Sequence, residues 1–505
     1  MTERDPASRP QLSALSKLAY SVGSIAFGLK AVAMGLLMLF YNQVMGLPAG
    51  WVSMGIGLAL ILDAIVGPVI GQVSDMWRSR WGRRHPFMYV AALPTAISVW
   101  ALLNPPHGWT NENLFIYMLS CIIVARFSVA MFEIPNSALL PELVPDYDGR
   151  TTLSGYRYLC GILIPVLVVV FALVVLLTPF VNAQGQHLPG QLNPAGYSKY
   201  GLTLAVVLLI AMLVSSLGTH REIKYLRQPS RHASRRDLIG SVVTALLNRN
   251  FIALMIAGLI SGIGAGLVEG LTAYFNTYFW ELSAKQLSGL TLSIVIAPIG
   301  GTLLSPYLAR KFGKKPAVIA AYFLSLFVGI APMSLRLLGV LPPNGSPIIL
   351  PLLIVDAVIA STLVIVGLII LTSMMADIVE EVQAKTGHRS EGLLFSFNTL
   401  LKQVVTGVGA MGTGFILQFV HFPANAVPGQ VPAAVLDKLA LVYLPITFVS
   451  SVIAISAISF FTISRADHER NILMAARAAE LVERDGSVGQ GVPEAPAPGV
   501  ADGDR

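Results

Sequence analysis

The feature that most constrains this chain is the recurrence of long apolar stretches along almost its whole length. A helix needs about 20 apolar residues to cross the hydrocarbon core of a bilayer, and such stretches follow one another here with only short polar interruptions. Hydrophobic residues make up 54% of the 505 residues and charged residues only 12%, against about 25% in a typical soluble domain. The chain is therefore predicted to be an all-α membrane protein that crosses the bilayer many times.

The apolar stretches predict twelve transmembrane helices. Their expected ranges are 17–46, 50–74, 86–103, 112–138, 151–179, 199–218, 250–280, 284–309, 316–338, 347–376, 391–420 and 434–464. The longest internal hydrophilic stretch, 219–249, separates a first six-helix bundle, 17–218, from a second, 250–464. The tail 1–16 carries no recognisable cleaved signal peptide. The tail 465–505 is predicted to be partly disordered by its composition.

Basic residues lie in alternate loops between the predicted helices. They gather at residues 78–84, 150, 221–236, 310–315 and 385–389, whereas the intervening loops carry few. Cytoplasmic loops of membrane proteins are enriched in lysine and arginine, so these loops and both termini are predicted to be cytoplasmic, in a multi-pass protein of the inner membrane. Because the loops account for the net charge of +7, no nucleic-acid partner is expected.

The two halves also repeat each other in sequence. The segment WGRRHP at 81–86, after the second span, corresponds to FGKKP at 312–316, after the eighth. Likewise PELVPDYDGR after the fourth span corresponds to ADIVEEVQAKTGHR after the tenth. Two six-helix repeats around a central pathway are typical of secondary transporters, so transport of a small solute is the predicted function.

A few charged residues interrupt the apolar spans. Each costs at least about 2.5 kcal/mol at the bilayer centre unless it finds a partner or a water-filled cavity. From the rise of a helix, Asp63 is expected about 18 Å from the cytoplasmic end of its span. The candidates are Lys30, Asp63, Arg126, Glu133, Arg157, Glu269, Asp356 and Lys402.

Four of these charges, on Asp63, Glu133, Arg157 and Lys402, are predicted to meet around a common cavity at mid-membrane depth. The alternative for each is a salt bridge that only holds helices together. Arg126 is expected to play such a structural part and to extend toward the outer end of its helix. For Lys30, Glu269 and Asp356 both possibilities remain open.

Several short patterns point away from an enzyme. The segment GVGAMG, 407–412, matches a dinucleotide-binding pattern but lies in an apolar helix, so its glycines are assigned to close helix packing. The aromatic run YFNTYFW, 274–280, is interpreted as an interfacial belt, with stacking on a ligand as the alternative. No pattern for ATP, metal or hydrolase chemistry is found, and neither a metal nor a cofactor is expected.

Three segments resemble the glycoside-pentoside-hexuronide cation symporters of the major facilitator superfamily. They are LDAIVGPVIGQVSDMWRSRWGRRHPF at 62–87, FEIPNSALLPELVPDYDGRTTLSGYR at 132–157 and ADIVEEVQAKTGHRSEGLLFSFNTLLKQ at 376–403. The resemblance extends over nearly all of the chain except its termini. It implies the twelve-helix fold of that superfamily and symport of a small solute with a cation by alternating access, by a protein that functions as a monomer.

The resemblance also implies roles for individual residues. Asp63 and Lys402 match the cation-coupling site of melibiose permease-like members, and Glu133 and Arg157 match the sugar site. The cytoplasmic loop signature, which gates the two halves in the family, is matched by Asp75, Arg78, Arg83 and Arg84.

The chain departs from the family at its cation site. The second acid of the family's site is Gly67 here, the neighbouring polar position is Val66, and a hydroxyl position on the fourth span is Ala130. A sodium ion needs several oxygen ligands, whereas a single carboxylate can load and release a proton. Proton coupling, or no coupling, is therefore expected over sodium.

The chain also departs from the family at its sugar site. The aspartate that grips sugar hydroxyls is Gly28 here, and the tryptophan that stacks on the sugar is Ser137. The expected substrate is a glycoside or a related small organic solute. The alternatives are a lysolipid-like or other amphiphilic solute and a sensor that binds ligand without transporting it, with a membrane enzyme as a third.

Overall fold

The structure is a computed structural model that describes residues 12–144, 147–225, 248–386 and 391–463. The predictions for residues 1–11, for most of the central loop and for the tail after residue 463 lie outside this part of the chain. Within it, eleven helices are long and apolar enough to cross a membrane. They begin and end within a few residues of the predicted spans, except where the tenth runs on to Thr386.

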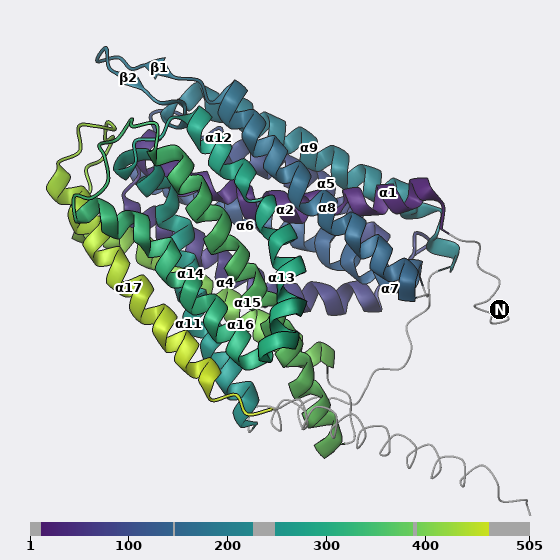
Figure 1. The fold of residues 1–505 in the computed structure, drawn as a ribbon. Coiled ribbons are helices and arrows are strands. Elements are labelled where there is room, and N and C mark those ends of the chain that lie inside the picture. The colour runs from purple at the N-terminus through teal and green to yellow at the C-terminus, as the bar shows by residue number, and fades with distance from the viewer. Residues whose placement is uncertain (1–11, 145–146, 226–247, 387–390, 464–505) are drawn as a thin grey trace, which may run out of the picture.

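The long helices follow one another in chain order, as Figure 1 shows. They are α4 (Ala49–Met76), α5 (His85–Leu102), α6 (Asn111–Ala138), α8 (Tyr147–Phe171), α9 (Pro194–His220), α11 (Arg249–Tyr274), α14 (Lys314–Leu337), α15 (Ile349–Thr386), α16 (Glu391–Phe419) and α17 (Ala433–Ser459). The eighth predicted span forms α12 (Ala284–Ser293) and α13 (Ile296–Phe312), and a short α7 (Leu140–Leu143) follows α6.

The first predicted span is not one continuous helix. It forms α1 (Ala14–Val22), α2 (Ser24–Val32), a 3-10 turn (Ala33–Leu36), α3 (Leu37–Leu39) and a π-helical turn η3 (Phe40–Val44). At the first break, a side chain on Gly23 would lie only 2.5 Å from the Ser215 hydroxyl of α9, so the two elements approach too closely for any residue but glycine. The segmented first span explains why eleven membrane-crossing helices are found in the described part of the chain instead of twelve.

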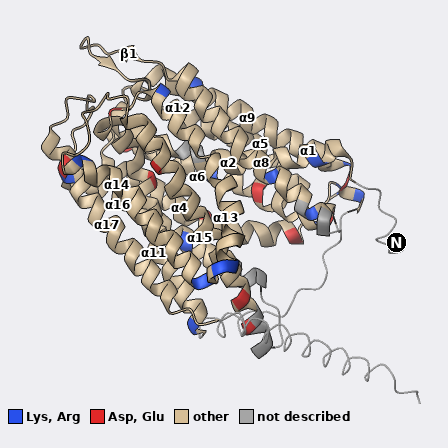
Figure 2. Ribbon diagram, in the orientation of Figure 1, with Lys and Arg blue, Asp and Glu red and all other residues tan. Residues whose placement is uncertain are grey.

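The helices pack both within each half of the chain and across the halves. In the first half α5 packs against α6 and α9, and in the second half α11 packs against α16 and α17 while α14 packs against α15. The main contacts across the halves are α4 with α16 and α8 with α12. Charged residues lie mostly near helix ends, with a few inside the helices (Figure 2).

Two ends of the bundle can be distinguished. A small antiparallel hairpin, β1 (Phe180–Val181) with β2 (His187–Leu188), projects from one end, which we call the hairpin end (Figure 1). We call the opposite end, which carries α7 and the loop 77–84, the basic end.

The glycines of the GVGAMG segment serve helix packing, as predicted. A side chain on Gly407 would lie 2.8 Å from the Gly57 carbonyl oxygen of α4, and one on Gly409 would overlap the Ile263 carbonyl oxygen of α11. These glycines let α16 approach both neighbouring helices at backbone distance. Since α4 and α11 belong to different halves, α16 forms a central part of the junction between the halves.

The aromatic run 274–280 closes the hairpin end, and its interpretation as an interfacial belt is wrong. Tyr274 and Tyr278 are fully buried at the end of α11 and in the π-helical turn η7 (Phe275–Phe279). The Tyr274 hydroxyl donates a hydrogen bond of 2.6 Å to Asn42 Oδ1, and the Tyr278 hydroxyl donates one of 3.3 Å to Gln43 Oε1. Both bonds join the two halves, which are therefore closed at this end.

Candidate functional site

A buried polar cluster lies where Asp63, on α4, meets three other elements. The Lys30 ammonium of α2 lies 2.7 Å from Asp63 Oδ2, and the Arg126 Nη1 of α6 lies 3.2 Å from the same oxygen. Gln403 Nε2, on α16 of the second half, donates a hydrogen bond of 2.7 Å to it. One carboxylate oxygen therefore accepts from three donors, and it links the first half of the chain to the second.

The cluster balances its charges inside the bundle. The Asp63 side chain is only 3% exposed and the Lys30 side chain 15% exposed. The Glu133 carboxylate, one-quarter exposed, lies 3.8 Å from the Lys30 ammonium. The charges of these three residues and Arg126 sum to zero. Since an unpaired charge in this environment costs several kcal/mol, the four side chains act as one unit.

Arg126 lies in this cluster and not where the sequence placed it. Its side chain is buried and turns to Asp63, so the expectation that it would extend toward the outer end is wrong. The reason is that a desolvated guanidinium gains more from a buried carboxylate than from a long reach to the membrane surface. Lys30, whose role was open, pairs locally with the same carboxylate.

Lys402 does not join the cluster in this conformation, although the sequence predicted that it would. Among the described residues no acidic side chain lies within ion-pair distance of Lys402, and the next residue, Gln403, makes the contact with Asp63. Successive residues of a helix point about 100° apart, so a shift of one position changes which side chain faces α4. Gln403 was not predicted as a site residue, although a polar side chain within an apolar span was a signal that could have identified it.

Arg157 lies close to α6 but apart from the acidic groups. Its Nη2 donates a hydrogen bond of 2.9 Å to the Ser137 hydroxyl, and its guanidinium lies 5.1 Å from the centre of the buried Tyr20 ring. Within the described part of the chain it has no acidic partner. Ser137 follows Glu133 by one helical turn, so the sugar-site candidates Glu133 and Arg157 are neighbours that are not paired with each other.

Two positions that carry an acid in the family, 28 and 67, are glycines here, and their surroundings differ. A side chain on Gly28 would overlap the Gly161 carbonyl oxygen, because α2 crosses α8 at backbone distance there. A side chain on Gly67 would meet nothing closer than 3.7 Å, from Ile134. The aspartate missing at position 28 is therefore excluded by packing, whereas the acid missing at position 67 is not.

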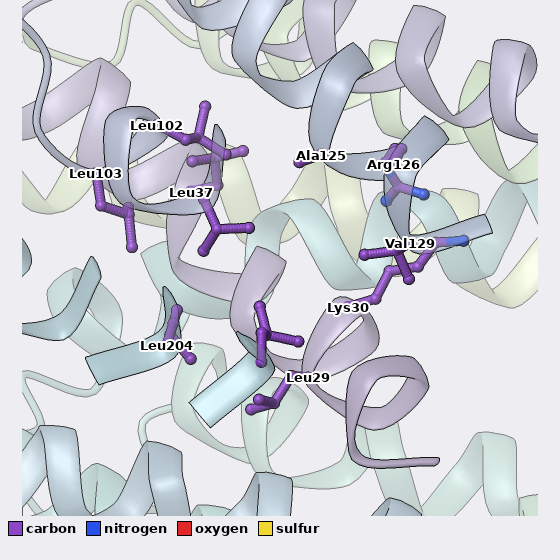
Figure 3. Close-up of a pocket in the computed structure, with 11 residues that line it drawn as sticks. Leu29, Lys30, Leu37, Leu102, Leu103, Ala125, Arg126, Val129 and Leu204 are labelled. Atoms are coloured by element: carbon purple, nitrogen blue, oxygen red, sulfur yellow. The ribbon is translucent and has the colours of Figure 1, made fainter. Parts of the chain in front are cut away.

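Two cavities adjoin the cluster. One lies within the first half and is almost entirely apolar, with Lys30 and Arg126 at its rim (Figure 3). The other lies between the halves, where Arg126 and Glu269 line it together with Thr413. Glu269 is exposed in this second cavity. Asp356, on α15, is half-buried and forms no ion pair with any described residue.

A second charged cluster lies at the basic end. Arg83 and Arg84, which precede α5, both pair with Glu142 of α7, and the distance from Arg84 Nη1 to Glu142 Oε1 is 2.9 Å. Arg84 Nη2 also lies 3.1 Å from Asp75 Oδ1 at the end of α4. Arg78 is exposed and takes no part in these pairs.

The second half repeats this arrangement. The Lys314 ammonium lies 2.7 Å from both oxygens of Asp377, as its sequence counterpart Arg83 pairs with Glu142. Gly82 and Gly313, which precede the two cations, both have positive φ, of 75° and 85°. Each pair stays within its own half. Among the described residues the basic end thus has no ion pair between the halves, while the hairpin end is joined by hydrogen bonds.

The sequence comparisons agree with this architecture. The profile of a family described as MFS/sugar transport protein matches residues 19–465. The isoprimeverose transporter of Lactiplantibacillus pentosus is 24% identical, over 89% of this chain and 89% of that protein. An uncharacterized symporter of Synechocystis, sll1374, is 26% identical over 91% and 96% of the two chains. The putative glycoside/cation symporter YagG of Escherichia coli is 23% identical over 96% and 98%.

Solved structures share the fold at low sequence identity. A bacterial homologue of the human lysosomal transporter Spinster, in an inward-facing and unoccupied conformation, gives a TM-score of 0.62 with 14% identity, over 90% of this chain and 98% of that one. A D-xylose-proton symporter gives 0.59 with 14% identity, over 87% and 96%. From the family profile, these relatives and the fold, the chain belongs to the MFS/sugar transport protein family, as a symporter of the glycoside-pentoside-hexuronide type and thus a secondary active transporter.

Proposed function

We propose that this protein couples the movement of protons to the uptake of a glycoside by alternating access between its two six-helix bundles, 17–218 and 250–464. The observation that carries the proposal is the hydrogen bond from Gln403 to Asp63, which ties a buried, charge-balanced cluster of the first bundle to the second. A change of protonation in this cluster changes the contact between the bundles. The known relatives support transport of a sugar-containing solute.

The basic end is proposed to face the cytoplasm, because lysine and arginine are enriched in cytoplasmic loops. Both termini then lie in the cytoplasm of a protein that we propose functions as a monomer. The hydrogen bonds that close the hairpin end support the proposal that this conformation is the one open to the cytoplasm. In the opposite state, Asp75, Arg78, Arg83 and Arg84 are proposed to meet the second bundle as the cytoplasmic gate.

Protons are proposed as the coupling ion, with Asp63 as the carboxylate that accepts them. In this conformation three donors, from Lys30, Arg126 and Gln403, point at one oxygen of Asp63. Protonation weakens all three contacts together, and Lys30 then turns to Glu133, which already lies 3.8 Å away. Lys402, one residue from Gln403, is proposed to approach the cluster when α16 shifts.

Glu133 and Arg157 are proposed to bind the solute. The Arg157 guanidinium is held at Ser137 and Tyr20 and forms no ion pair with an acidic residue in the described part of the chain, so it is suited to a carboxylate or to hydroxyl groups of a sugar. This observation favours a second candidate beside a neutral glycoside, namely a glycoside that carries a uronic acid.

A survey of solutes on the purified protein tests the proposal. Counterflow into proteoliposomes and thermal shift, each at two pH values, would compare neutral glycosides, uronic-acid glycosides and lysolipids. We expect counterflow of at least one glycoside class and a loss of it in Arg157→Ala, while Arg78→Ala, which changes an exposed arginine, keeps the solute preference. Stabilisation by lysolipids alone, or binding without flux, would contradict the proposed function.

A further inference from the structure

We propose that the Lys30 ammonium occupies the cation position of this transporter and acts as a tethered substitute for a bound sodium ion. The inference deepens the proposed function, on which it rests, because it assigns the choice of coupling ion to a residue. It makes Lys30 a residue that determines which coupling ion the protein accepts.

The position of the ammonium supports this assignment. It lies 2.7 Å from Asp63 Oδ2 and 3.8 Å from Glu133 Oε2, so it stands between two carboxylates from different helices. The side chain is only 15% exposed, and Asp63 has no room for a further cation on the oxygen that already meets Lys30, Arg126 and Gln403. A free cation would have to displace a charge that is covalently attached to α2.

The charge balance gives the same result. The cations Lys30 and Arg126 compensate the carboxylates of Asp63 and Glu133. A sodium ion added to this set would leave one uncompensated positive charge in the interior of the bundle, which is costly. If the Lys30 ammonium is removed, the remaining three charges sum to minus one, which a single monovalent cation neutralises.

A purely structural salt bridge makes a different prediction. If Lys30 only holds α2 against α4, its removal lowers stability and creates no response to sodium. If Lys30 substitutes for sodium, its removal creates a site with two carboxylates and the Gln403 amide, whose oxygen can turn toward a cation. Position 67 has space for a side chain to begin, since the nearest atom to a Cβ added there is 3.7 Å away, on Ile134.

The test is thermal unfolding of purified Lys30→Ala in sodium chloride and in choline chloride at equal ionic strength. We expect sodium to raise the melting temperature of this variant by about 2–4 °C, and to have no specific effect on the wild type or on Lys438→Ala. Lys438→Ala is the control because it removes an exposed lysine of α17 that contacts the Phe419 carbonyl oxygen and belongs to neither the cluster nor the proposed gate. The double variant Lys30→Ala with Asp63→Asn should lose the response, and Lys30→Ala with Gly67→Asp should strengthen it.

Two results would overturn the inference. One is a folded Lys30→Ala protein, shown by a single size-exclusion peak, that does not respond to sodium. The other is a wild type that responds equally. If Lys30→Ala does not fold, Lys30→Gln provides the same comparison with a longer side chain. Because the readout uses neither solute nor gradient, it is independent of glycoside flux, so failure of this inference and failure of the proposed function can be told apart.

Discussion

Replacement of Asp63 by asparagine is expected to abolish concentrative uptake while the protein remains folded. The substitution removes the one group that meets Lys30, Arg126 and Gln403 together, and with it the proposed proton carrier. Loss of one partner from a buried ion pair costs about 3–5 kcal/mol, so a lower melting temperature is expected as well. Lys30 retains Glu133 as a partner, which limits that cost. Proton-driven uptake into vesicles, measured beside counterflow, checks the result.

The control for this experiment is Gln403→Ala, which removes one hydrogen bond of the cluster and none of its charges. A hydrogen bond to a charged group contributes about 1.5–3 kcal/mol, so we expect a reduced rate of uptake with accumulation preserved. Unchanged accumulation by Asp63→Asn would remove Asp63 from the coupling mechanism. Equal loss in both variants would assign the effect to packing of α4 on α16 and not to charge.

Restoring the family's sugar-site acid by Gly28→Asp is expected to prevent folding. Any side chain at position 28 overlaps the Gly161 carbonyl oxygen, so α2 and α8 would have to separate along their crossing. Overpacking of a core typically costs about 1–3 kcal/mol, and overlap with backbone leaves little room for relaxation. Gly67→Asp adds the same side chain at a position where a Cβ lies 3.7 Å from its nearest neighbour, and it should be tolerated.

Size-exclusion profiles and melting temperatures of the two variants in detergent check this contrast. The pair is matched because both place an aspartate in a transmembrane helix of the first half. Normal folding of Gly28→Asp together with sugar binding would show that the α2 crossing adapts to a side chain. Aggregation of both variants would mean that the added charge, and not the close approach at Gly28, decides the outcome.

The sequence predicted the long helices well because apolar length alone determines them in a bilayer. It could not predict the segmented first span, which depends on a glycine facing Ser215 of a distant helix. The π-helical turns at the ends of the first, fifth and seventh spans were also missed. The polar pair Asn42 and Gln43, at the end of an apolar helix, was a signal for the closure that they form with Tyr274 and Tyr278.

For the site, the sequence predicted that charged residues within the helices meet in a cluster, but not how they pair. Helix rise placed Asp63 and Glu133 at similar depth, and both contact Lys30. Depth does not give the direction in which a side chain points, which depends on how each helix is rotated in the bundle. For that reason Arg126 was predicted to lie outside the cluster, and Lys402 was predicted to make the contact with Asp63 that Gln403 makes.

The most direct test of the account is uptake of a transported glycoside into proteoliposomes under imposed gradients. We predict that a proton gradient directed inward drives accumulation, that a protonophore abolishes it, and that an inward sodium gradient at fixed pH drives none. Accumulation driven by the sodium gradient at fixed pH, with no response to the proton gradient, would contradict both the proposed coupling and the assignment of Lys30.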